Sequence, residues 1–153
     1  MFRISVLVAL LSCGLLVGCG DDQVDNWNDL DQALGGQELN GCDGTSAAYT
    51  DLRGRASVTI TDISAWEDPH KACIGVSPGT AVTWVGNFDT HPLVGGVSPT
   101  TDSTSPITEA DPSGTGDMAT TTVTFEATDE IAVEPYFCTA HPANMGGVIA
   151  VFP

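Results

Sequence analysis

The chain has 153 residues, of which 42% are hydrophobic and 16% charged, so we expect one packed domain with accessory segments. There are 20 acidic side chains against 4 of Lys and Arg, and the formal net charge is -16. This excess disfavours nucleic acid and anionic membrane surfaces as partners. It serves solubility in a salty medium or the docking of a basic protein, and the even spread of the acids favours the first interpretation.

The first 18 residues are typical of a targeting signal. Arg3 is followed by an apolar run, from Ile4 to Leu16, that is too short to span a bilayer with ease. The sequence Leu16-Val17-Gly18-Cys19 resembles the lipobox of bacterial lipoproteins. This resemblance implies cleavage before Cys19 and a lipid on its sulfur, which would anchor the protein on the periplasmic or cell-surface side of a membrane. The alternative is an ordinary secretory signal in which Cys19 occurs by chance.

Residues 19 to 41 are acidic and rich in Asn and Gln, which predicts a mostly disordered tether between the anchor and the domain. Trp27, Leu30 and Leu34 recur at helical spacing within this stretch. A short amphipathic helix docked on the domain is therefore the alternative. The domain itself is expected over residues 42 to 153.

Short runs of β-branched and apolar residues, separated by turn signals, predict a fold made of strands. Residues 95 to 117 are rich in Gly, Ser, Thr, Pro and Asp, and we expect a long surface excursion there. Long helical periodicity is absent, so the expected fold is an all-β, antiparallel Greek-key sandwich. The predicted strands cover residues 56–61, 72–76, 81–85, 117–127, 131–138 (interrupted at Pro135) and 148–152.

A thiol, an imidazole and a thioether lie close together near the end of the sequence, at Cys138, His141 and Met145. Cysteine sulfur and histidine nitrogen are ligands that copper prefers, and a methionine sulfur can serve as a weak, distant ligand. A second imidazole would complete a His₂Cys set, and His91 follows the predicted strand at 81–85. Taken singly, each of these residues has an ordinary structural interpretation; their order and spacing together favour a copper site.

These residues resemble those of the cupredoxin family, which includes plastocyanin, pseudoazurin, amicyanin and halocyanin. The resemblance covers about residues 56 to 153 and is strongest in Tyr136-Phe137-Cys138-Thr139-Ala140-His141. It implies one type 1 (blue) copper ion and one-electron transfer rather than catalysis. It also implies an uncharged surface patch around the second histidine through which electrons pass. The implied ligands are His91, Cys138, His141 and, as the long axial ligand, Met145; the implied patch is Pro92, Leu93, Pro142 and Ala143.

One departure from the family concerns the residue after the first histidine. Pro92 stands where many members have an Asn whose side chain ties the two ligand loops together. Such supporting contacts fix the orientation of metal ligands. Whether Thr90 or Thr139 replaces the contact is left open by the sequence.

Cysteine usage adds a constraint. Beyond the signal and Cys19, three cysteines remain: Cys42, Cys73 and Cys138. An exported protein meets an oxidising compartment, so two of the three are expected to pair. If Cys138 is a metal ligand, Cys42 and Cys73 form the disulfide; any other pairing would remove the copper ligand.

The expected function is therefore that of a monomeric, lipid-anchored electron carrier outside the cytoplasmic membrane. Its partner would be a redox protein, for example a basic c-type cytochrome. The alternative is a copper-trafficking or storage protein that uses the same site. An enzyme is not expected, because no paired carboxylates or nucleophile–base pair stand out and only His70 is left over as a further imidazole.

Overall fold

The computed structural model describes residues 27–61, 72–107 and 113–153. The signal segment, Cys19 and His70 lie outside these ranges, so the predictions for them stay predictions. Within the described ranges strands predominate, with one α-helix, α1 (Trp27–Ala33), and two 3-10 helices, η1 (Ser46–Ala48) and η2 (Gly116–Met118). None of these described helices is long and apolar enough to cross a membrane.

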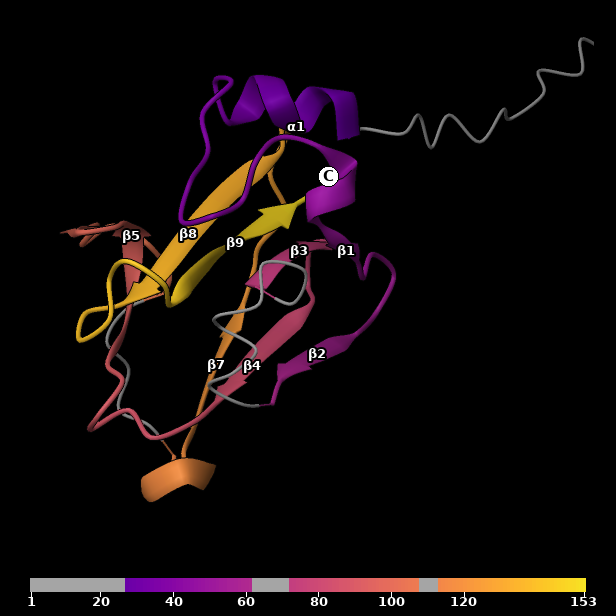
Figure 1. The fold of residues 1–153 in the computed structure, drawn as a ribbon. Helices are drawn as coiled ribbons and strands as arrows, with labels where there is room; N and C mark the ends of the chain where they lie inside the picture. The colour runs from indigo at the N-terminus through magenta and orange to yellow at the C-terminus, as the bar shows by residue number, and fades with distance from the viewer. Residues whose placement is uncertain (1–26, 62–71, 108–112) are drawn as a thin grey trace, which may run out of the picture.

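The strands of the described part form two sheets (Figure 1). The larger sheet has the strand order β1-β3-β9-β8-β5-β6, and the smaller has the order β2-β4-β7. The larger sheet consists of β1 (Thr50–Asp51), β3 (Cys73–Val76), β9 (Gly146–Val151), β8 (Ala132–Cys138), β5 (Leu93–Val97) and β6 (Thr100–Thr101). The smaller sheet consists of β2 (Ser57–Ile60), β4 (Ala81–Val85) and β7 (Thr120–Thr124).

Both sheets are mixed, so the prediction of purely antiparallel sheets is wrong. Strand β3 pairs in parallel with β1 and with β9, and β2 pairs in parallel with β4. The other pairings of named strands are antiparallel: β4 with β7, β5 with β6, β5 with β8, and β8 with β9. Parallel strands need a crossover, and β3 supplies one: it follows β2 in the chain but lies in the other sheet. The alternation of apolar and polar residues predicts strands without predicting their direction.

One hydrophobic cluster, here called the central cluster, contains side chains from both sheets. Val82 and Trp84 on β4 are fully buried, whereas their neighbours Thr83 and Val85 are only half-buried, as strand alternation requires. The ring of Trp84 meets that of Tyr136 edge-on at 5.3 Å. The central cluster consists of Val58, Ile60, Ile74, Val76, Val82, Trp84, Leu93, Ile107, Phe125, Tyr136, Cys138, Met145, Ile149 and Val151.

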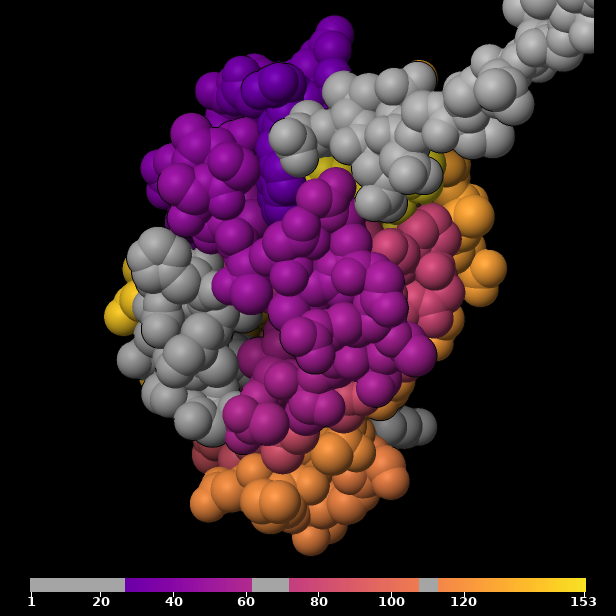
Figure 2. All heavy atoms as spheres, turned by 90° about the vertical axis from the view of Figure 1, so that its right-hand side faces the viewer, coloured from indigo at the N-terminus to yellow at the C-terminus, as the bar shows by residue number. Residues whose placement is uncertain are grey.

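Residues 27 to 41, the described part of the segment predicted as a tether, include the docked helix of the alternative prediction. Leu30 and Leu34 are 0% and 5% exposed, and they share a cluster with Val148 and Ala150 of β9. The indigo N-terminal segment lies directly against the rest of the molecule (Figure 2). The described residues before Cys42 are therefore part of the packed unit. The second cluster, here called the helix cluster, consists of Leu30, Leu34, Cys42, Tyr49, Cys73, Val148, Ala150 and Phe152.

Two further segments differ from expectation. Strand β8 runs through Pro135 without a break, because β5 pairs only with residues 136 to 138 and Pro135 lies beyond that pairing. The predicted excursion at 95–117 begins inside β5 and includes the buried Ile107, at 1% exposure. A Cβ on Gly95 would lie 2.2 Å from the hydroxyl oxygen of Ser105, so glycine is needed where these segments meet.

Candidate metal centre

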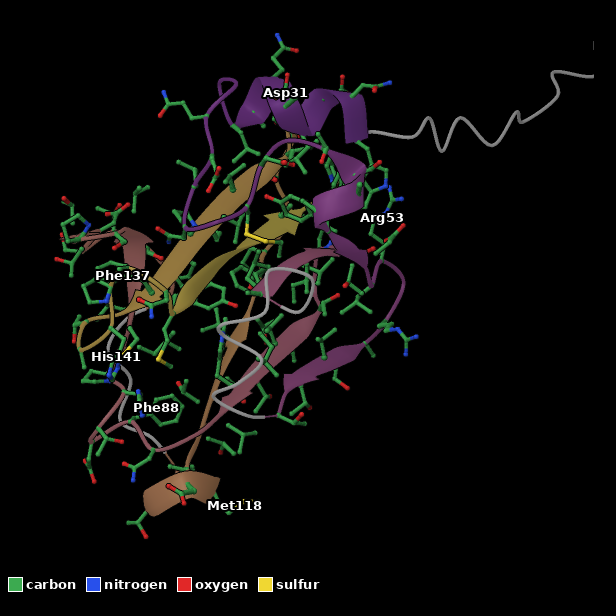
Figure 3. The ribbon with its side chains drawn as sticks, viewed as in Figure 1. Asp31, Arg53, Phe88, Met118, Phe137 and His141 are labelled. Atoms are coloured by element: carbon green, nitrogen blue, oxygen red, sulfur yellow. A yellow bond between two sulfur atoms is a disulfide. The ribbon has the colours of Figure 1, made fainter. Side chains whose placement is uncertain are left out.

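The pairing of β5 with β8 brings the first histidine to the cysteine. Leu93 is paired with Cys138, the last residue of β8, and His91 lies two residues before Leu93 in the chain. His141 follows Cys138 by three residues, in the loop that leads to β9. Figure 3 shows His141 and Phe88 at one end of the molecule, away from Asp31 and Arg53 at the α1 end.

Three donor side chains converge at this end of the molecule. The Nδ1 atoms of His91 and His141 lie 3.9 and 3.8 Å from the Sγ atom of Cys138. The ligand atoms of all three residues lie within 4.8 Å of one another, so the group could hold a metal ion. The two imidazole rings stack with their centroids 4.8 Å apart.

The spacing of the donors is compatible with a shared metal ion. For metal–sulfur and metal–nitrogen distances of about 2.3 and 2.0–2.1 Å, each of the two S···N separations is short enough for one ion to bond both atoms. The group therefore offers one sulfur and two imidazole nitrogens to a metal ion.

The three donors differ in burial. Cys138 is 0% exposed, His91 is half-buried and His141 is exposed. Cys138 is also the free cysteine of the described part, because Cys42 and Cys73 form a disulfide. The predicted pairing of Cys42 with Cys73 is thus confirmed, and a buried thiol is left available for a metal.

Backbone hydrogen bonds close the loop that carries Cys138, His141 and Met145. The Cys138 N–H donates to the Met145 carbonyl at 2.8 Å, and the Met145 N–H donates to the His141 carbonyl at 3.1 Å. The His141 N–H donates back to the Cys138 carbonyl at 3.2 Å. Met145 is 2% exposed and belongs to the same central cluster as Cys138. The loop thus places the predicted axial residue in the same core cluster as the thiol.

The two ligand loops are tied together by a backbone hydrogen bond. The Thr139 N–H donates to the Pro92 carbonyl at 3.1 Å, so the residue after Cys138 is fixed to the residue after His91. The hydroxyl of Thr90 instead bonds to Asn87 within its own turn. The backbone therefore links the two ligand loops, although Pro92 stands at the position where an Asn side chain was considered for this link.

Asn87 is a supporting residue that the sequence did not suggest. Its carbonyl accepts the N–H of His91 at 2.8 Å and that of Thr90 at 3.3 Å, which fixes the turn before the histidine. Its side-chain amide donates to Asp117 at 3.3 Å, across to the segment before β7. The only sign of this role in the sequence is an Asn near the start of a turn, and such an Asn is common in loops of every kind.

The predicted uncharged patch is only partly at the surface. Pro142 and Ala143 are exposed next to His141, and Pro92 is half-buried. Leu93 is 3% exposed and packs in the central cluster, so its inclusion in the patch is wrong. The physical reason is that Leu93 begins β5 and faces the core from the position paired with Cys138.

The two aromatic residues before the thiol are core residues. Tyr136 and Phe137 are 0% and 2% exposed. Burial raises the pKa of Tyr136. Its protonated hydroxyl donates to the Ala72 carbonyl at 3.1 Å, which joins β8 to the segment just before β3. These contacts stiffen the strand that ends in Cys138.

No protein-family model matches the chain, and a search of curated proteins finds no relative for it.

Proposed function

We propose that the protein is a type 1 copper protein that carries single electrons. The observation that carries this proposal is the buried, free Cys138 thiol, with the Nδ1 atoms of His91 and His141 at 3.9 and 3.8 Å from its sulfur. Met145, buried in the same cluster, would be the weak axial ligand. A His₂Cys set with a long axial Met is the arrangement of copper sites in electron transfer.

The donor set supports copper over zinc. Structural zinc sites are tetrahedral and use four Cys, His or carboxylate ligands. Here the fourth candidate is the Met145 thioether, which is not among those zinc ligands. Soft sulfur combined with imidazole favours copper among the common ions.

Copper bound at this site would supply reversible one-electron exchange. The chain's own contribution is to hold the donors still, because a site that moves little between its two oxidation states exchanges electrons readily. The backbone bonds Thr139 to Pro92 and Cys138 to Met145 hold the two loops, and the core excludes water from the thiol. His141 alone among the three donors is exposed, and it offers the shortest route between the buried sulfur and the surface.

The proposed docking surface for a redox partner is the edge of His141 with exposed Pro142 and Ala143 beside it. An uncharged contact of this kind loses little by desolvation, whereas the net charge of -16 would orient a basic partner from a distance. We propose a monomer whose partner is a small redox protein such as a c-type cytochrome. Electron transfer of this kind requires no substrate pocket, and we assign no catalytic reaction to the chain.

We also propose a cupredoxin-like sandwich as the fold. The support is the central cluster, to which both sheets contribute, and the position of the donors at one end of it. Parallel pairings occur in both sheets, so the sandwich is proposed as a mixed one.

The proposed location is outside the cytoplasmic membrane, with a lipid on Cys19. The disulfide Cys42–Cys73 supports an oxidising compartment. Because α1 begins at Trp27, only residues 20 to 26 would separate the lipid from the packed domain. At about 3.3–3.6 Å per residue, such a tether reaches at most about 30 Å.

Loading the purified protein with Cu(II) tests the proposal. We expect an intense blue colour from charge transfer between the Cys138 thiolate and copper, with one ion bound per chain. A protein that binds copper tightly and stays colourless would contradict a type 1 site. Rapid electron exchange with a reduced c-type cytochrome would then separate a carrier from a copper-trafficking or storage protein, which would turn blue but exchange slowly.

A further inference from the structure

A tight turn in the N-terminal segment lies against the loop that carries Cys138, His141 and Met145. Leu39 and Cys42 exchange two backbone hydrogen bonds of 2.9 and 2.8 Å around Asn40 and Gly41. Both central residues have positive φ, 50° for Asn40 and 85° for Gly41. This is the geometry of a type I′ turn, for which Asn-Gly is the preferred pair. The disulfide at Cys42 fixes the end of the turn to β3.

The side chain of Asn40 joins the strands on both sides of the ligand loop. Its Nδ2 atom donates to the Tyr136 carbonyl at 2.8 Å and approaches the Gly147 carbonyl at 3.5 Å. Tyr136 precedes Cys138 by two residues, and Gly147 follows Met145 by two. The amide therefore sits where β8 enters the loop and β9 leaves it.

The same side chain also reaches the end of β5. Nδ2 donates to the Gly96 carbonyl at 3.0 Å, and Oδ1 accepts the Ser98 N–H at 2.9 Å. The Ser98 hydroxyl in turn donates to the Pro142 carbonyl in the ligand loop. One amide thus connects three strand ends, and through Ser98 it connects to the residue after His141.

The backbone beside Met145 is shaped for this contact. A Cβ on Gly146 would lie 3.3 Å from the Cβ of Asn40 and 2.7 Å from the Tyr136 carbonyl oxygen. Glycine at 146 therefore permits the close approach of Asn40. A groove of 440 Å³ lies between the turn and the loop, and Asn40, Ser98 and Pro142 are among its lining residues. The N-terminal segment therefore supports the loop beside this groove through Asn40, directly and by its bond to Ser98.

We propose that Asn40 is a positioning residue for the ligand loop, held in place by the Asn-Gly turn and the Cys42–Cys73 disulfide. It touches none of the donor atoms; it acts by fixing the two strand ends from which Cys138 and Met145 are presented. The role in loop order stands on the hydrogen bonds alone, whereas its effect on copper rests on the proposed function. A segment outside both sheets would in this way set the rigidity of the site.

The test compares Asn40→Gly with the native chain. Glycine keeps the positive φ and removes the amide, so the turn itself should still form. In the metal-free protein we expect amide hydrogen exchange of residues 138–147 to become about tenfold faster, because the substitution removes at least two part-buried hydrogen bonds that oppose local opening there. Exchange in β4 should not change. Ser98→Ala, which removes only the link to Pro142, should give a smaller effect in the same direction.

A copper-loaded readout accompanies the exchange measurement. We expect Asn40→Gly to broaden or shift the thiolate absorption and the paramagnetic spectrum, and to alter the reduction potential. The matched control is Asn28→Ala, which removes an exposed amide from the same N-terminal segment and should change nothing. Uniformly faster exchange throughout the protein, or unchanged exchange at 138–147, would overturn the proposal. If the native protein does not turn blue, the copper function fails, and the exchange result still decides the role of Asn40.

Discussion

Strand β9 separates two regions that use the same kinds of side chain for different purposes. Ile149 and Val151 face the central cluster, whereas Val148 and Ala150 face the helix cluster. In the helix cluster the sulfurs of Cys42 and Cys73 are joined in a disulfide. In the central cluster the sulfur of Cys138 is free.

Aromatic contacts differ between the two regions as well. In the helix region Trp27 meets Phe152 edge-on at 4.7 Å, and the Arg53 guanidinium lies 5.1 Å from the centre of the Trp27 ring and 4.9 Å from that of Phe152. This end of the molecule is stabilised by aromatic packing, by the Cys42–Cys73 disulfide and by the cation–π contacts of Arg53. The donor end reaches the surface at His141. Stability and the donor set can therefore be changed from opposite faces of one strand, although the Asn40 turn links the disulfide to the ligand loop.

The largest expected effect is that of Cys138→Ser at the donor end. The hydroxyl has nearly the shape of the thiol but cannot supply a thiolate, so the blue absorption should disappear completely. The metal-free protein should remain folded, with its unfolding free energy changed by about 1–2 kcal/mol. Copper titration followed by absorption, together with urea denaturation, measures both. A variant that keeps the band would remove Cys138 from the site.

The second-largest expected effect is the loss of stability in the double variant Cys42→Ala/Cys73→Ala, at the helix end. The disulfide closes a segment of 31 residues, and its loss should lower the unfolding free energy by about 2–4 kcal/mol. The folded variant should still bind copper and keep a thiolate band, which we expect to be broadened or shifted because the disulfide also holds the Asn40 turn beside the ligand loop. Urea denaturation with and without copper is the measurement. Loss of the band in a fully folded variant would show that the two regions are not separable.

Met145→Gln tests the donor end more finely. An amide oxygen in place of the thioether should lower the reduction potential and change the absorption spectrum, because the axial ligand tunes such sites. Met145 is 2% exposed, so a cost of about 1–2 kcal/mol in unfolding free energy is also expected. The matched control is Met118→Gln, at a side chain 77% exposed. Equal reduction potentials for the Met145→Gln and Met118→Gln variants would show that Met145 is not a ligand of the metal.

The smallest expected effect is that of Asp51→Asn at the helix end. Hydrogen bonds from the Arg53 side chain, at 2.9 and 2.6 Å, hold the pKa of Asp51 below its ordinary value of 3.8. A lowered folded pKa stabilises the fold above that ordinary value, and the contribution is lost as the pH falls through the lowered pKa. The side chains of Arg53 and Asp51 are 25% and 46% exposed, so solvent screens the pair and the substitution should cost less than about 1 kcal/mol at neutral pH.

Urea denaturation at neutral pH and at a pH well below 3.8 measures this difference. At the acidic pH the native Asp51 is protonated in both states, and the cost of the substitution should vanish. Asp129→Asn, at an exposed position, serves as the control. A cost independent of pH would mean that the packing of Arg53 over its rings, and not the charge of Asp51, is what matters.

Much of the donor end could be predicted from the sequence because its signals are local. The strand at 81–85 alternates cleanly and is found with those bounds. Cys138, His141 and Met145 share one short loop, so their proximity follows from their spacing. The distant His91 required the pairing of β5 with β8, which the sequence suggests only through its place after a strand. The disulfide followed from having three cysteines and one role for Cys138.

What escaped prediction depends on contacts between distant segments. Parallel pairing in both sheets leaves no mark on residue alternation. The docking of α1 depends on an apolar surface that β9 and the disulfide region provide, so the polar sequence around Leu30 appeared disordered. The Thr139–Pro92 bond is made by peptide groups, which every residue carries. Nothing in the sequence around Leu93 distinguishes a surface residue from the first residue of a buried strand.

The position of β9 has a consequence for the order in which the protein can assemble. It is the last of the described strands along the chain, yet it lies in the interior of its sheet, between β3 and β8. Until residues 146–151 have been made, β3 and β8 lack their shared neighbour and the thiol of Cys138 has no cover from that side. A nascent chain therefore carries the thiols of Cys42, Cys73 and Cys138 together before its sheet can close. Correct pairing of Cys42 with Cys73 before β9 arrives would protect the third thiol from the wrong partner.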